Sequence, residues 1–480
     1  MTAVSVTRTA PPNMGRSWWL REALALPEFE GEPAPPLAED TAADVVIMGG
    51  GYTGMWTAWF LKEHDPGIDV VLLEQDICGG GPSGRNGGFL DGWLGHASDL
   101  IATYGEAGAK VLIDAVAPSV DEIAAWGEAH GVDAWFRRGG DLAVATNQTQ
   151  VGRWTSTLEA AARLGLAGGM LELSADEVRA RCDGPSFVGG MFIPDTATVQ
   201  PARLARGLRQ VLMERGVRIF EGTPVTRFGA GSPTVAETPG GTVRAGEAVI
   251  GLGAWATSWR RFRPYLTIRG SYMVVTEPAP DRLAELNWIG GEAVRDLRAS
   301  IHYLRTTPDG RIAIGLGGVQ RGLARGVGPS FAYDEGFVRK VADDLHDLFP
   351  SFRDVPIVAG WGGPINVSGF NLPFFGTAAP GNVHHGLGYT GNGVAPSYLG
   401  GKILASLATH ADDELTRLPI VGRTPKRFPP EPIRSPGMLV ANTAIWHKDD
   451  TEAGGGTANP VARLVATAPR RLGYNLGPRR

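Results

Sequence analysis

The sequence predicts an α/β protein with a Rossmann-like dinucleotide-binding domain. An apolar run at 44–48 enters the glycine turn 49–54, from which a helix is expected to leave. A second apolar run at 70–73 ends at Glu74, an acid that can hydrogen-bond a ribose hydroxyl. A bare glycine pattern is a weak signal in a chain with 68 glycines. Strand, turn, helix, strand and acid in this order are far more specific for a dinucleotide site.

Each glycine of the turn has a separate task in such a site. Gly49 makes the tight turn, Gly51 lets the backbone approach a pyrophosphate, and Gly54 lets the helix pack closely on the strand. Tyr52 and Thr53 begin the helix. Because the N-terminal amides of a helix attract anions, we expect the phosphates of the cofactor at this point.

Composition limits the possible partners. The chain has 480 residues, 43% of them apolar, which suffices for about two to four domain-sized units. Its net charge of -5 gives no reason to expect nucleic acid or an anionic membrane as a partner. Two cysteines, Cys78 and Cys182, exclude a disulfide framework and most zinc sites, and we expect no metal. Without an apolar leader or a long apolar run, we expect a cytoplasmic protein.

The first half of the chain alternates between helical and strand-like segments. The Pro-rich residues 1–40 indicate an extended arm, and the glycine-rich loop 78–88 suits neither a helix nor a strand. Ser174 and Glu177 have the spacing of a capping box. Apolar spacing and turn residues predict helices at 98–138, 153–164, 174–181 and 201–215, and strands at 140–145, 187–193 and 217–220.

A second approach to the cofactor and a second sheet follow. An apolar strand enters a turn at Gly251 and Gly253, with Trp255 just beyond. Several strand-like runs between 267 and 316, two of them joined by the turn 308–310, predict an antiparallel sheet.

The last part of the chain contains a third glycine loop. A helix is expected at 334–348, and the loop 388–394 leads into another helix at 395–409. Such a helix N-terminus suits the anionic or electron-accepting end of a ligand. From Asp412 onward the Pro, Arg and Gly content is typical of a wrapped or mobile tail.

Three glycine segments in order, 49–54, 83–88 and 388–393, make the chain resemble the D-amino-acid-oxidase-type FAD-dependent oxidoreductases over about residues 40–410. The Ser-Gly-Arg-Asn-Gly-Gly sequence at 83–88 is similar to the branch that includes gamma-glutamylputrescine oxidases. Further matching positions are Asp195, 200–204, Arg269, Gly270, 304–310 and 361–363. The resemblance thus implies that the dinucleotide is FAD.

The resemblance also implies a discontinuous architecture. A Rossmann-like FAD/NAD(P)-binding domain is assembled from three segments, and a discontinuous α+β substrate domain built on the antiparallel sheet comes from the two segments between them. The expected divisions are an N-terminal arm 1–40, FAD-binding segments 41–100, 186–266 and 356–411, substrate segments 101–185 and 267–355, and a C-terminal tail 412–480.

The contacts with FAD follow from the same resemblance. The first two glycine segments hold the pyrophosphate and ribityl chain, Glu74 holds the adenosine ribose, and Val225 contacts the adenine through its backbone. The loop at 391–394 presents amides to the flavin O2 and N1 edge, where negative charge develops on reduction. The expected cofactor contacts are Gly49, Gly51, Tyr52, Thr53, Gly54, Glu74, Gln75, Gly81, Ser83, Gly84, Arg85, Asn86, Gly87, Gly88, Val225, Gly251, Gly253, Trp255, Gly388, Tyr389, Gly391, Asn392, Gly393 and Val394.

We expect the FAD to be noncovalent. Relatives with attached flavin use a cysteine late in the chain or a histidine in the loop after the second strand. Here the cysteines lie elsewhere, and no histidine occurs between Glu74 and Trp93. Gln200 and Asn392 stand where the branch usually carries histidine, so Asn392 still offers an amide donor but no titratable group.

Sites of this family transfer a hydride from the carbon beside an amine nitrogen to flavin N5, and the resulting imine hydrolyses to an aldehyde or oxo acid. The protein must hold a deprotonated amine beside N5 in a site closed to water. Aromatic faces suit an amine through cation–π contact, although most aromatic residues simply pack the core. The candidate substrate contacts are Tyr52, Trp93, Tyr272, His302, Tyr303, Arg305, Trp361 and Phe370.

Strand alternation separates some of these candidates. His302 and Tyr303 face opposite sides of one strand, and the matching residues around them favour Tyr303 for the flavin side. Arg305 shares the face of Tyr303 and could hold a substrate carboxylate bidentately, with a surface salt bridge as an equal alternative. The catalytic site is assigned to Tyr303, Arg305, Tyr52, Trp361 and Tyr272.

The electron acceptor stays open. Oxidases of the sarcosine-oxidase type place a lysine above the flavin for reaction with oxygen, yet residues 111–339 contain no lysine. One possibility is an oxidase, in which oxygen accepts the electrons and becomes hydrogen peroxide. The alternative is an FAD dehydrogenase or oxygenase that acts on a specialised biosynthetic amine with an acceptor other than oxygen. A noncatalytic flavin-binding subunit would require a blocked pocket. An NAD-dependent dehydrogenase would leave the second and third glycine loops without a purpose.

Overall fold

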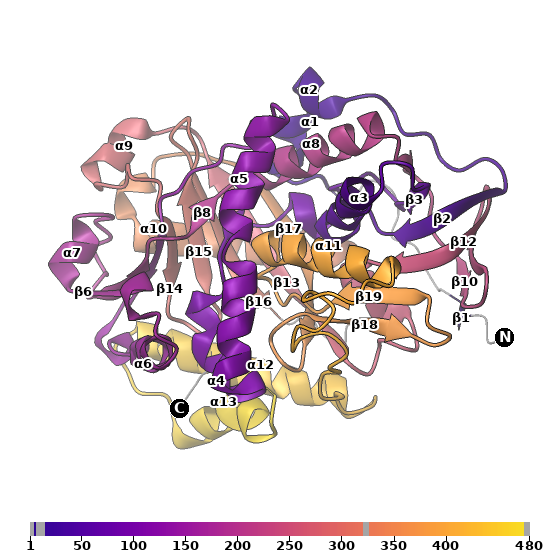
Figure 1. The fold of residues 1–480 in the computed structure, drawn as a ribbon. Coiled ribbons are helices and arrows are strands. Elements are labelled where there is room, and N and C mark those ends of the chain that lie inside the picture. Colours follow the sequence, from indigo (N-terminus) through magenta and orange to yellow (C-terminus); the bar gives the residue numbers. More distant parts are fainter. Residues whose placement is uncertain (1–3, 6–14, 320–325, 475–480) are drawn as a thin grey trace.

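The computed structural model describes residues 4–5, 15–319 and 326–474. Within these residues the chain builds a nine-stranded sheet, an eight-stranded sheet and a two-stranded ladder. Figure 1 shows the two large sheets beside each other, with the C-terminal helices in yellow below them. This arrangement confirms the predicted α/β fold with a Rossmann-like domain and a second domain built on a largely antiparallel sheet.

The nine-stranded sheet has a parallel core. Its strands are β1 (Val4–Ser5), β2 (Thr41–Met48), β3 (Val70–Leu73), β9 (Arg218–Phe220), β10 (Arg227–Gly229), β11 (Thr234–Thr238), β12 (Gly241–Ile250), β18 (Phe374–Ala378) and β19 (Val383–Leu387). The strands β12, β2, β3 and β9 run parallel in that order, and β19 lies parallel to β12 on a separate branch. Residues 45–48 and all of β3 are buried, as central strands covered on both faces require.

Four helices cover this sheet. They are α3 (Tyr52–His64), α5 (Ser119–Ala129), α8 (Pro201–Glu214) and α11 (Val394–Ala408). Helices α3 and α11 pack directly against each other, and α5 packs on α11. Both glycine loops that precede α3 and α11 therefore open toward the same region of the molecule.

The eight-stranded sheet pairs in the order β17-β13-β16-β15-β14-β5-β7-β6. The bounds of these strands are β5 (Asp141–Val144), β6 (Leu171–Leu173), β7 (Gly190–Ile193), β13 (Leu266–Thr276), β14 (Ala293–Asp296), β15 (His302–Thr306), β16 (Ile312–Val319) and β17 (Ile357–Ser368). Neighbours are antiparallel except β14 and β5, which are parallel. The antiparallel sheet predicted between 267 and 316 is therefore present, and it recruits strands from outside that range.

Two of those strands shift the expected domain boundaries. The segments 186–266 and 356–411 were assigned to the cofactor domain, but they begin with β7 and β17, which pair with β5 and β13 of the eight-stranded sheet. A strand-like sequence does not indicate which sheet the strand joins, because strand pairing depends on tertiary contacts. A short ladder between β4 (Phe89–Leu90) and β8 (Ala197–Thr198) links the two domains.

Among the remaining helices of the body, α6 (Thr155–Arg163), α7 (Ala175–Arg179) and α10 (Glu335–Leu348) match their predicted positions. The helix predicted at 98–138 is divided into α4 (Ala97–Val116) and α5, and α9 (Pro280–Glu285) was not predicted. The capping box of Ser174 and Glu177 at the start of α7 is formed. Short 3₁₀ turns are η1 (Pro82–Gly84), η2 (Leu94–His96), η3 (Gln148–Gln150), η4 (Ala167–Gly169), η5 (Gly253–Ser258), η6 (Pro329–Phe331) and η7 (Pro350–Phe352).

The N-terminal segment is more ordered than the predicted extended arm. It contains α1 (Trp18–Leu24) and α2 (Pro27–Glu30), which both pack on α8. Ser17 accepts a hydrogen bond from the backbone of Leu20 and donates one to the Gly84 carbonyl, so the cap of α1 also touches the second glycine loop. The rest of the predicted arm, 1–3 and 6–14, lies outside the described residues.

The predicted C-terminal tail contains two helices instead. They are α12 (Arg434–Ala453) and α13 (Pro460–Arg471), and they pack against each other. Ion pairs tie them to the body, from Arg470 to Asp99 on α4 and from Glu452 to Arg153. The glycine and proline content of this segment did not indicate helices. The helices form nevertheless, because helix stability in proteins comes mostly from tertiary packing.

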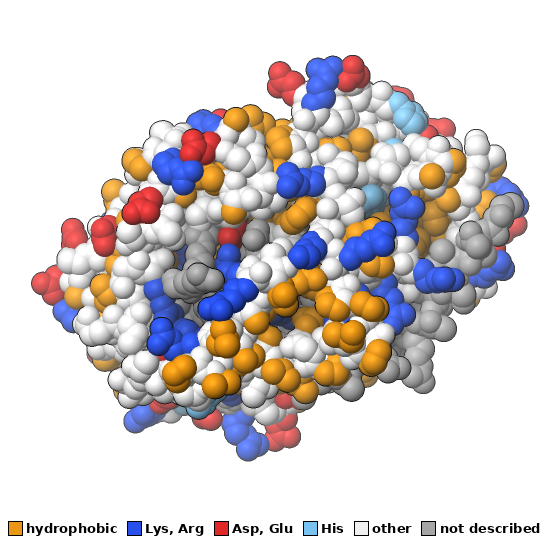
Figure 2. Space-filling view, turned by 90° about the horizontal axis from the view of Figure 1, so that it is seen from below, with side chains coloured by type: hydrophobic (Ala, Val, Ile, Leu, Met, Phe, Trp, Pro, Cys, Tyr) orange, Lys and Arg blue, Asp and Glu red, His pale blue; other side chains and the backbone are white. Residues whose placement is uncertain are grey.

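The outer face of these C-terminal helices carries apolar side chains beside basic ones. Figure 2, seen from below, shows apolar side chains gathered next to Lys and Arg side chains on that face. Val440, Val461 and Leu464 are more than half exposed there. In the described ranges, no helix combines the length and apolar character needed to cross a lipid bilayer.

Candidate functional site

A large cavity lies between the two sheets. Its volume is about 2260 Å³, and its wall includes the glycine turn at Gly49, the loop at Gly391, Tyr303 on β15 and Lys448 on α12. Pockets for one small ligand are usually about 300–1,000 Å³. The cavity can therefore hold a dinucleotide and a second molecule at the same time.

The glycine turn is shaped by close backbone contacts. Gly49 has φ of 109°, and a Cβ there would lie 2.7 Å from the Gly251 carbonyl oxygen. A Cβ on Gly54 would lie 2.1 Å from the Gly49 carbonyl oxygen, so only glycine lets α3 approach the strand this closely. Gly51 differs, because its Cβ would meet only Ser83 and otherwise face the cavity.

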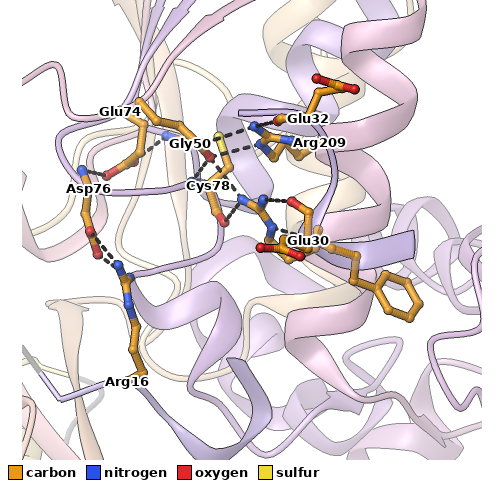
Figure 3. A network of polar contacts seen from close by, with 11 residues as sticks. Arg16, Glu30, Glu32, Gly50, Glu74, Asp76, Cys78 and Arg209 are labelled. Carbon is orange, nitrogen blue, oxygen red and sulfur yellow. Dashed lines mark hydrogen bonds and ion pairs between the residues drawn. The ribbon is translucent and has the colours of Figure 1, made fainter. Parts of the chain in front are cut away.

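Glu74 is held in place by two backbone amides. Its carboxylate accepts hydrogen bonds from the amides of Gly50 and Asp76, at 2.7 and 2.9 Å, as Figure 3 shows. Burial raises the pKa of Glu74 to about 7, against the opposing effect of those two amides. The carboxylate lines the cavity at the end of β3, where a ribose hydroxyl would add a further hydrogen-bond donor.

A buried ion cluster anchors the loop that follows Glu74. Glu221 accepts hydrogen bonds from Arg206, Arg209 and the backbone amide of Cys78, at 3.0, 3.0 and 2.7 Å. The same arginines donate to the carbonyls of Glu30 and Glu32 in the N-terminal segment (Figure 3). One carboxylate therefore joins α8, the cofactor loop and the N-terminal segment. We call Glu221, Arg206 and Arg209 the Glu221 cluster.

Arg85 fastens the second glycine loop to the other domain. Its guanidinium donates to the carbonyls of Gly80, Gly15 and Gly362, and its own carbonyl accepts from the indole of Trp361 at 2.9 Å. Trp361 packs against Trp19 and does not line the cavity. The prediction of Trp361 as a substrate contact is therefore wrong, because its ring supports the cofactor loop from behind.

Most of the predicted cofactor contacts do line the cavity. Those that do are Gly49, Gly51, Tyr52, Thr53, Glu74, Gln75, Gly81, Ser83, Arg85, Asn86, Gly87, Val225, Gly251, Gly253, Trp255, Tyr389, Gly391, Asn392, Gly393 and Val394. Gly54, Gly84, Gly88 and Gly388 instead lie one layer behind, where a Cβ would collide with backbone or side-chain atoms. Their part is to let the loops pack closely.

Of the predicted substrate contacts, Tyr303 reaches the cavity at the substrate-domain wall. Its ring lies against Gly87 and Gly315, and its hydroxyl lies 2.7 Å from the Ser271 hydroxyl. Ser271 donates its own hydrogen to the Leu316 carbonyl, so the Tyr303 hydroxyl is the donor between them. Tyr52 also lines the cavity, but its hydroxyl donates to the Pro201 carbonyl and so fixes α3 on α8.

Two other assignments of the catalytic site are wrong. Tyr272 is fully buried on the opposite face of β13, where it stacks on Phe337 and donates to the Ser330 carbonyl. Arg305 shares the face of Tyr303 as predicted but lies beyond the edge of the cavity. It donates to the Val199 carbonyl and lies over the Trp19 ring, so it does not reach a substrate.

The remaining aromatic candidates also pack in the interior. Trp93 is buried in the hydrophobic core of the cofactor domain, and Phe370 packs against the same core and Tyr104. Neither lines the cavity. Their neighbours Gly92, Leu94 and Asn371 do. The prediction therefore placed the backbone correctly beside the cavity at these positions. The sequence did not show that the two aromatic side chains point away from it.

His302 faces away from the cavity, between two carboxylates. Its ring nitrogens lie 2.7 Å from Asp296 and 3.0 Å from Asp344. Burial alone would lower the pKa of His302, but the two carboxylates outweigh it and raise the pKa to about 9. The alternation predicted for His302 and Tyr303 is thus present.

This histidine makes stability depend on pH. The folded state keeps the His302 proton up to about pH 9, whereas an unfolded histidine loses it near 6.5. Its stabilisation is therefore complete below pH 6.5 and is lost as the pH rises toward 9, a loss of about 3 kcal/mol. Urea unfolding of the wild type and of His302→Gln between pH 6 and 9.5 measures it. If the free energy of unfolding changed with pH by the same amount in both proteins, this assignment would be contradicted.

The sequence did not reveal the far wall of the cavity. Arg269 and Ser271 on β13, Arg295 on β14, and Lys448 and Glu452 on α12 all line it. Lys448 pairs with Glu452 at 2.7 Å, and Glu452 also pairs with Arg153. The lysine-free span 111–339 therefore does not leave the cavity without a lysine, since one arrives from the C-terminal helices.

The polar groups of the wall fit an acceptor-rich cofactor. Trp255 Nε1, Asn366 Nδ2 and Arg269 Nε are buried at the cavity wall, and each lacks a hydrogen-bond partner in the described part of the chain. All three are donors. The phosphates and the flavin carbonyls of FAD are acceptors, so the residues present fit this cofactor. No group of metal-binding side chains occurs among the described residues.

These features define the class of protein as a two-domain, dinucleotide-dependent enzyme. They are a Rossmann-like sheet, three glycine loops on one cavity, and a second sheet that closes this cavity. The family described as FAD dependent oxidoreductase, DAO, matches residues 44–407. The chain belongs to this family, and the predictions of FAD and of an oxidoreductase are confirmed at this level.

Curated relatives share most of the chain. Gamma-glutamylputrescine oxidoreductase of Escherichia coli (strain K12) is 30% identical over 382 residues, covering 78% of this chain and 85% of that protein. The probable oxidoreductase OrdL of Rhizobium meliloti is 28% identical over 425 residues, covering 86% of this chain and 92% of that protein.

Solved structures show the same fold. Glycine oxidase from Geobacillus kaustophilus matches with a TM-score of 0.66 and 20% identity, over 80% of this chain and 99% of that one. L-proline dehydrogenase from P. horikoshii matches with a TM-score of 0.61 and 19% identity, over 80% and 96%. The fold thus occurs both in an oxidase and in a dehydrogenase.

Proposed function

We propose that the protein oxidises the CH–NH bond of an amine or amino acid to an imine, which hydrolyses to an aldehyde or oxo acid. The substrate carbon gives up a hydride and the nitrogen a proton, and oxygen takes up the two electrons to form hydrogen peroxide. The main support for this proposal is that the glycine loops, Tyr303 and Ser271 all line one cavity. The name of the Escherichia coli relative, an oxidoreductase of an amine, also supports it.

In this proposal FAD is held without a covalent bond. Gly51 and Ser83 bind the phosphates, Glu74 the adenosine ribose, Val225 the adenine, and the residues 391–394 the flavin edge. When bound, FAD supplies the acceptor for the hydride that leaves the substrate carbon. Both cysteines are fully buried and neither lines the cavity, which supports noncovalent binding.

The protein contributes orientation and exclusion of water. Tyr303 presents its ring to the cavity between Gly87 and Gly315, where it can face the amine. Burial raises the pKa of Tyr303 to about 12, so its hydroxyl stays protonated at neutral pH and is not a base. In this proposal the amine binds against the ring as the ammonium and passes its proton to water before the hydride leaves.

Removing the Tyr303 ring tests this role. Tyr303→Leu is expected to lower kcat/KM for the best amine by about 30-fold, since a desolvated cation–π contact contributes about 2 kcal/mol. Tyr303→Phe keeps the ring and should lose no more than about fivefold, the value of one hydrogen bond. Steady-state kinetics measures both.

Tyr272→Phe is the matched control. It removes the same hydroxyl two strands away in the sheet, but on the face turned from the cavity, so kcat/KM should stay at the wild-type value. Wild-type kcat/KM in Tyr303→Leu would contradict the proposed placement of the amine.

A second candidate function is an FAD dehydrogenase or oxygenase with another electron acceptor and a specialised biosynthetic amine. The observation that favours it is the ion pair of Lys448 with Glu452, because the lysine that reaches the cavity is already paired. Likeness to both a glycine oxidase and an L-proline dehydrogenase does not decide between acceptors. A noncatalytic subunit is not favoured, since the cavity has room for a second molecule beside a dinucleotide.

The spectrum of the purified protein tests the proposal as a whole. Flavin absorbance should bleach when amines and amino acids are added without oxygen, and peroxide should form when air is admitted. Bleaching followed by slow reoxidation would select the dehydrogenase. A protein that takes up no FAD, or whose flavin no amine bleaches, would overturn the proposed function.

A further inference from the structure

An ion pair joins the N-terminal segment to the loop that follows β3. Arg16 donates two parallel hydrogen bonds to the Asp76 carboxylate, at 2.6 and 3.0 Å, as Figure 3 shows. The two side chains are 23% and 29% exposed, so the pair is partly shielded from water. Arg16 lies outside the residues 44–407 that match the family, so the family match does not account for this ion pair.

Asp76 is part of the structure that holds Glu74. Both residues line the cavity beyond the end of β3. The backbone amide of Asp76 donates a hydrogen bond to the Glu74 carboxylate at 2.9 Å, and the amide of Gly50 donates another at 2.7 Å. The Asp76 carbonyl accepts a hydrogen bond from the amide of Gly222 at 2.8 Å. A partner that fixes the Asp76 side chain therefore also fixes the amide that orients Glu74.

The neighbours of Arg16 hold it against the same loop. Ser17 donates a hydrogen bond to the Gly84 carbonyl, and the Gly15 carbonyl accepts one from the guanidinium of Arg85. Three consecutive residues of the N-terminal segment therefore contact the loop, and the fold sets the position of Arg16. Its side chain does not line the cavity, so it acts on a ligand through Asp76.

Arg16 also affects the charge around Glu74. Burial raises the pKa of Glu74 to about 7, and the carboxylates of Asp76 and Glu221 add to this effect. The nearby Cys78 thiol stays neutral, because burial raises its pKa well above the usual value. Glu221 is neutralised by the arginines of the Glu221 cluster. Asp76 is neutralised by Arg16, so without Arg16 its charge would raise the pKa of Glu74 further.

The ionised form of Glu74 suits a ribose better than the protonated form. An ionised carboxylate can accept about four hydrogen bonds, and the amides of Gly50 and Asp76 already occupy part of this capacity. The remaining capacity can accept ribose hydroxyls, whereas protonation removes part of it. A Glu74 that is ionised and correctly oriented therefore favours binding of an adenosine.

We propose that Arg16 is a positioning residue for the adenosine end of FAD, acting through Asp76 on the Glu74 carboxylate. The inference rests on the proposed function, which places the adenosine ribose at Glu74. It makes the N-terminal segment a part of the cofactor site, although Arg16 itself does not reach the cavity.

Titration of the full-length apoprotein with FAD at several pH values tests the proposal. Arg16→Gln is expected to weaken FAD binding by about tenfold at pH 7, because Glu74 loses both its orientation and part of its ionisation. At pH 8.5 more of Glu74 is ionised in both proteins, so the loss should shrink to about threefold. Quenching of flavin fluorescence measures the dissociation constants. A purely structural ion pair would weaken binding equally at both pH values.

Two further measurements separate the adenosine end from the rest of the cofactor. FMN has the flavin and one phosphate but no adenosine, so its affinity should be the same in the wild type and in Arg16→Gln. Arg16→Lys keeps the charge but not the two parallel hydrogen bonds. It should therefore weaken FAD by about threefold with the pH dependence of the wild type.

Arg218→Gln is the matched control. Arg218 donates two hydrogen bonds to Asp69, at 3.0 and 2.6 Å, just before β3 and thus at its opposite end. Neither residue lines the cavity, so FAD affinity should stay at the wild-type value. Circular dichroism checks that each variant is folded. The inference would be overturned by wild-type FAD affinity in Arg16→Gln, by an equal loss of FMN affinity, or by an equal loss at pH 7 and 8.5.

These outcomes are separate from those of the proposed function. If amines bleach the flavin and Arg16→Gln binds FAD like the wild type, only the role of Arg16 is refuted. If Arg16→Gln shows the expected loss but no amine bleaches the flavin, the amine oxidation is refuted and the role of Arg16 stands.

Discussion

Gly51→Val is expected to lower the affinity for FAD by about 100-fold or more while the protein still folds. The Cβ of residue 51 would meet only Ser83 Oγ at 3.1 Å, so the fold has room for it. Gly51 has φ of -85°, which valine also adopts. The added side chain would occupy the space where a pyrophosphate approaches the start of α3.

The size of the effect follows from the contacts that would be lost. Hydrogen bonds to a charged group contribute about 1.5–3 kcal/mol each, and displacing the phosphates by one side-chain width removes two or more. Titration of the apoprotein with FAD, followed by flavin fluorescence, measures the dissociation constant. Circular dichroism shows whether the variant is folded.

Gly437→Val provides the control for Gly51→Val. It makes the same substitution in α12, at a site where a Cβ meets nothing within 4 Å, and should leave FAD affinity unchanged. If Gly51→Val bound FAD as tightly as the wild type, the cofactor could not lie against this turn.

Glu221→Gln is expected to decrease the free energy of unfolding by about 3–5 kcal/mol. The carboxylate of Glu221 neutralises Arg206 and Arg209, which are only 4% and 1% exposed. Removing one partner of a buried pair leaves an uncompensated charge, and here two arginines would share a neutral amide. The backbone of Cys78 would keep a weaker acceptor.

The loss should spread to the cofactor loop and the N-terminal segment. Arg206 and Arg209 donate to the carbonyls of Glu30 and Glu32, so α2 is held by the same cluster (Figure 3). Urea denaturation measures the stability, and limited proteolysis measures whether α1 and α2 become accessible first. Glu335→Gln, which breaks an exposed pair with Arg339, should change stability by no more than about 0.5 kcal/mol.

A second variant distinguishes charge imbalance from a simple loss of packing. Replacing the whole Glu221 cluster by Leu at 221 and Met at 206 and 209 removes all three charges together. Such replacements of buried ion clusters are often neutral or stabilising, so much of the lost stability should return. A triple variant as unstable as Glu221→Gln would refute the charge explanation.

The cofactor half of the site could be predicted because it depends on local backbone conformation. Gly49 needs a positive φ, Gly54 must let a helix touch a strand, and Glu74 must follow a buried strand. These requirements act over a few residues and leave a pattern that can be recognised in a sequence. The resemblance in three glycine segments then supplied FAD.

The substrate half was predicted less well, because it is assembled from residues far apart in the chain. Alternation along β15 correctly separated His302 from Tyr303. It could not show that the cavity stops before Arg305, where Trp19 from the N-terminal segment covers the strand. Nor could it show that β17 turns the Trp361 indole behind the cofactor loop.

From the sequence alone one could therefore predict a Rossmann-like FAD site, an antiparallel second sheet and a Tyr303 side chain that faces the cavity. Only the tertiary structure assigned β7 and β17 to the second sheet, brought α12 with Lys448 to the cavity, and left Arg269 Nε without a hydrogen-bond partner among the described residues. Turn geometry and strand periodicity are local properties of the chain. The pairing of charges and the closure of a cavity depend on which distant side chains pack together, and no short pattern encodes that.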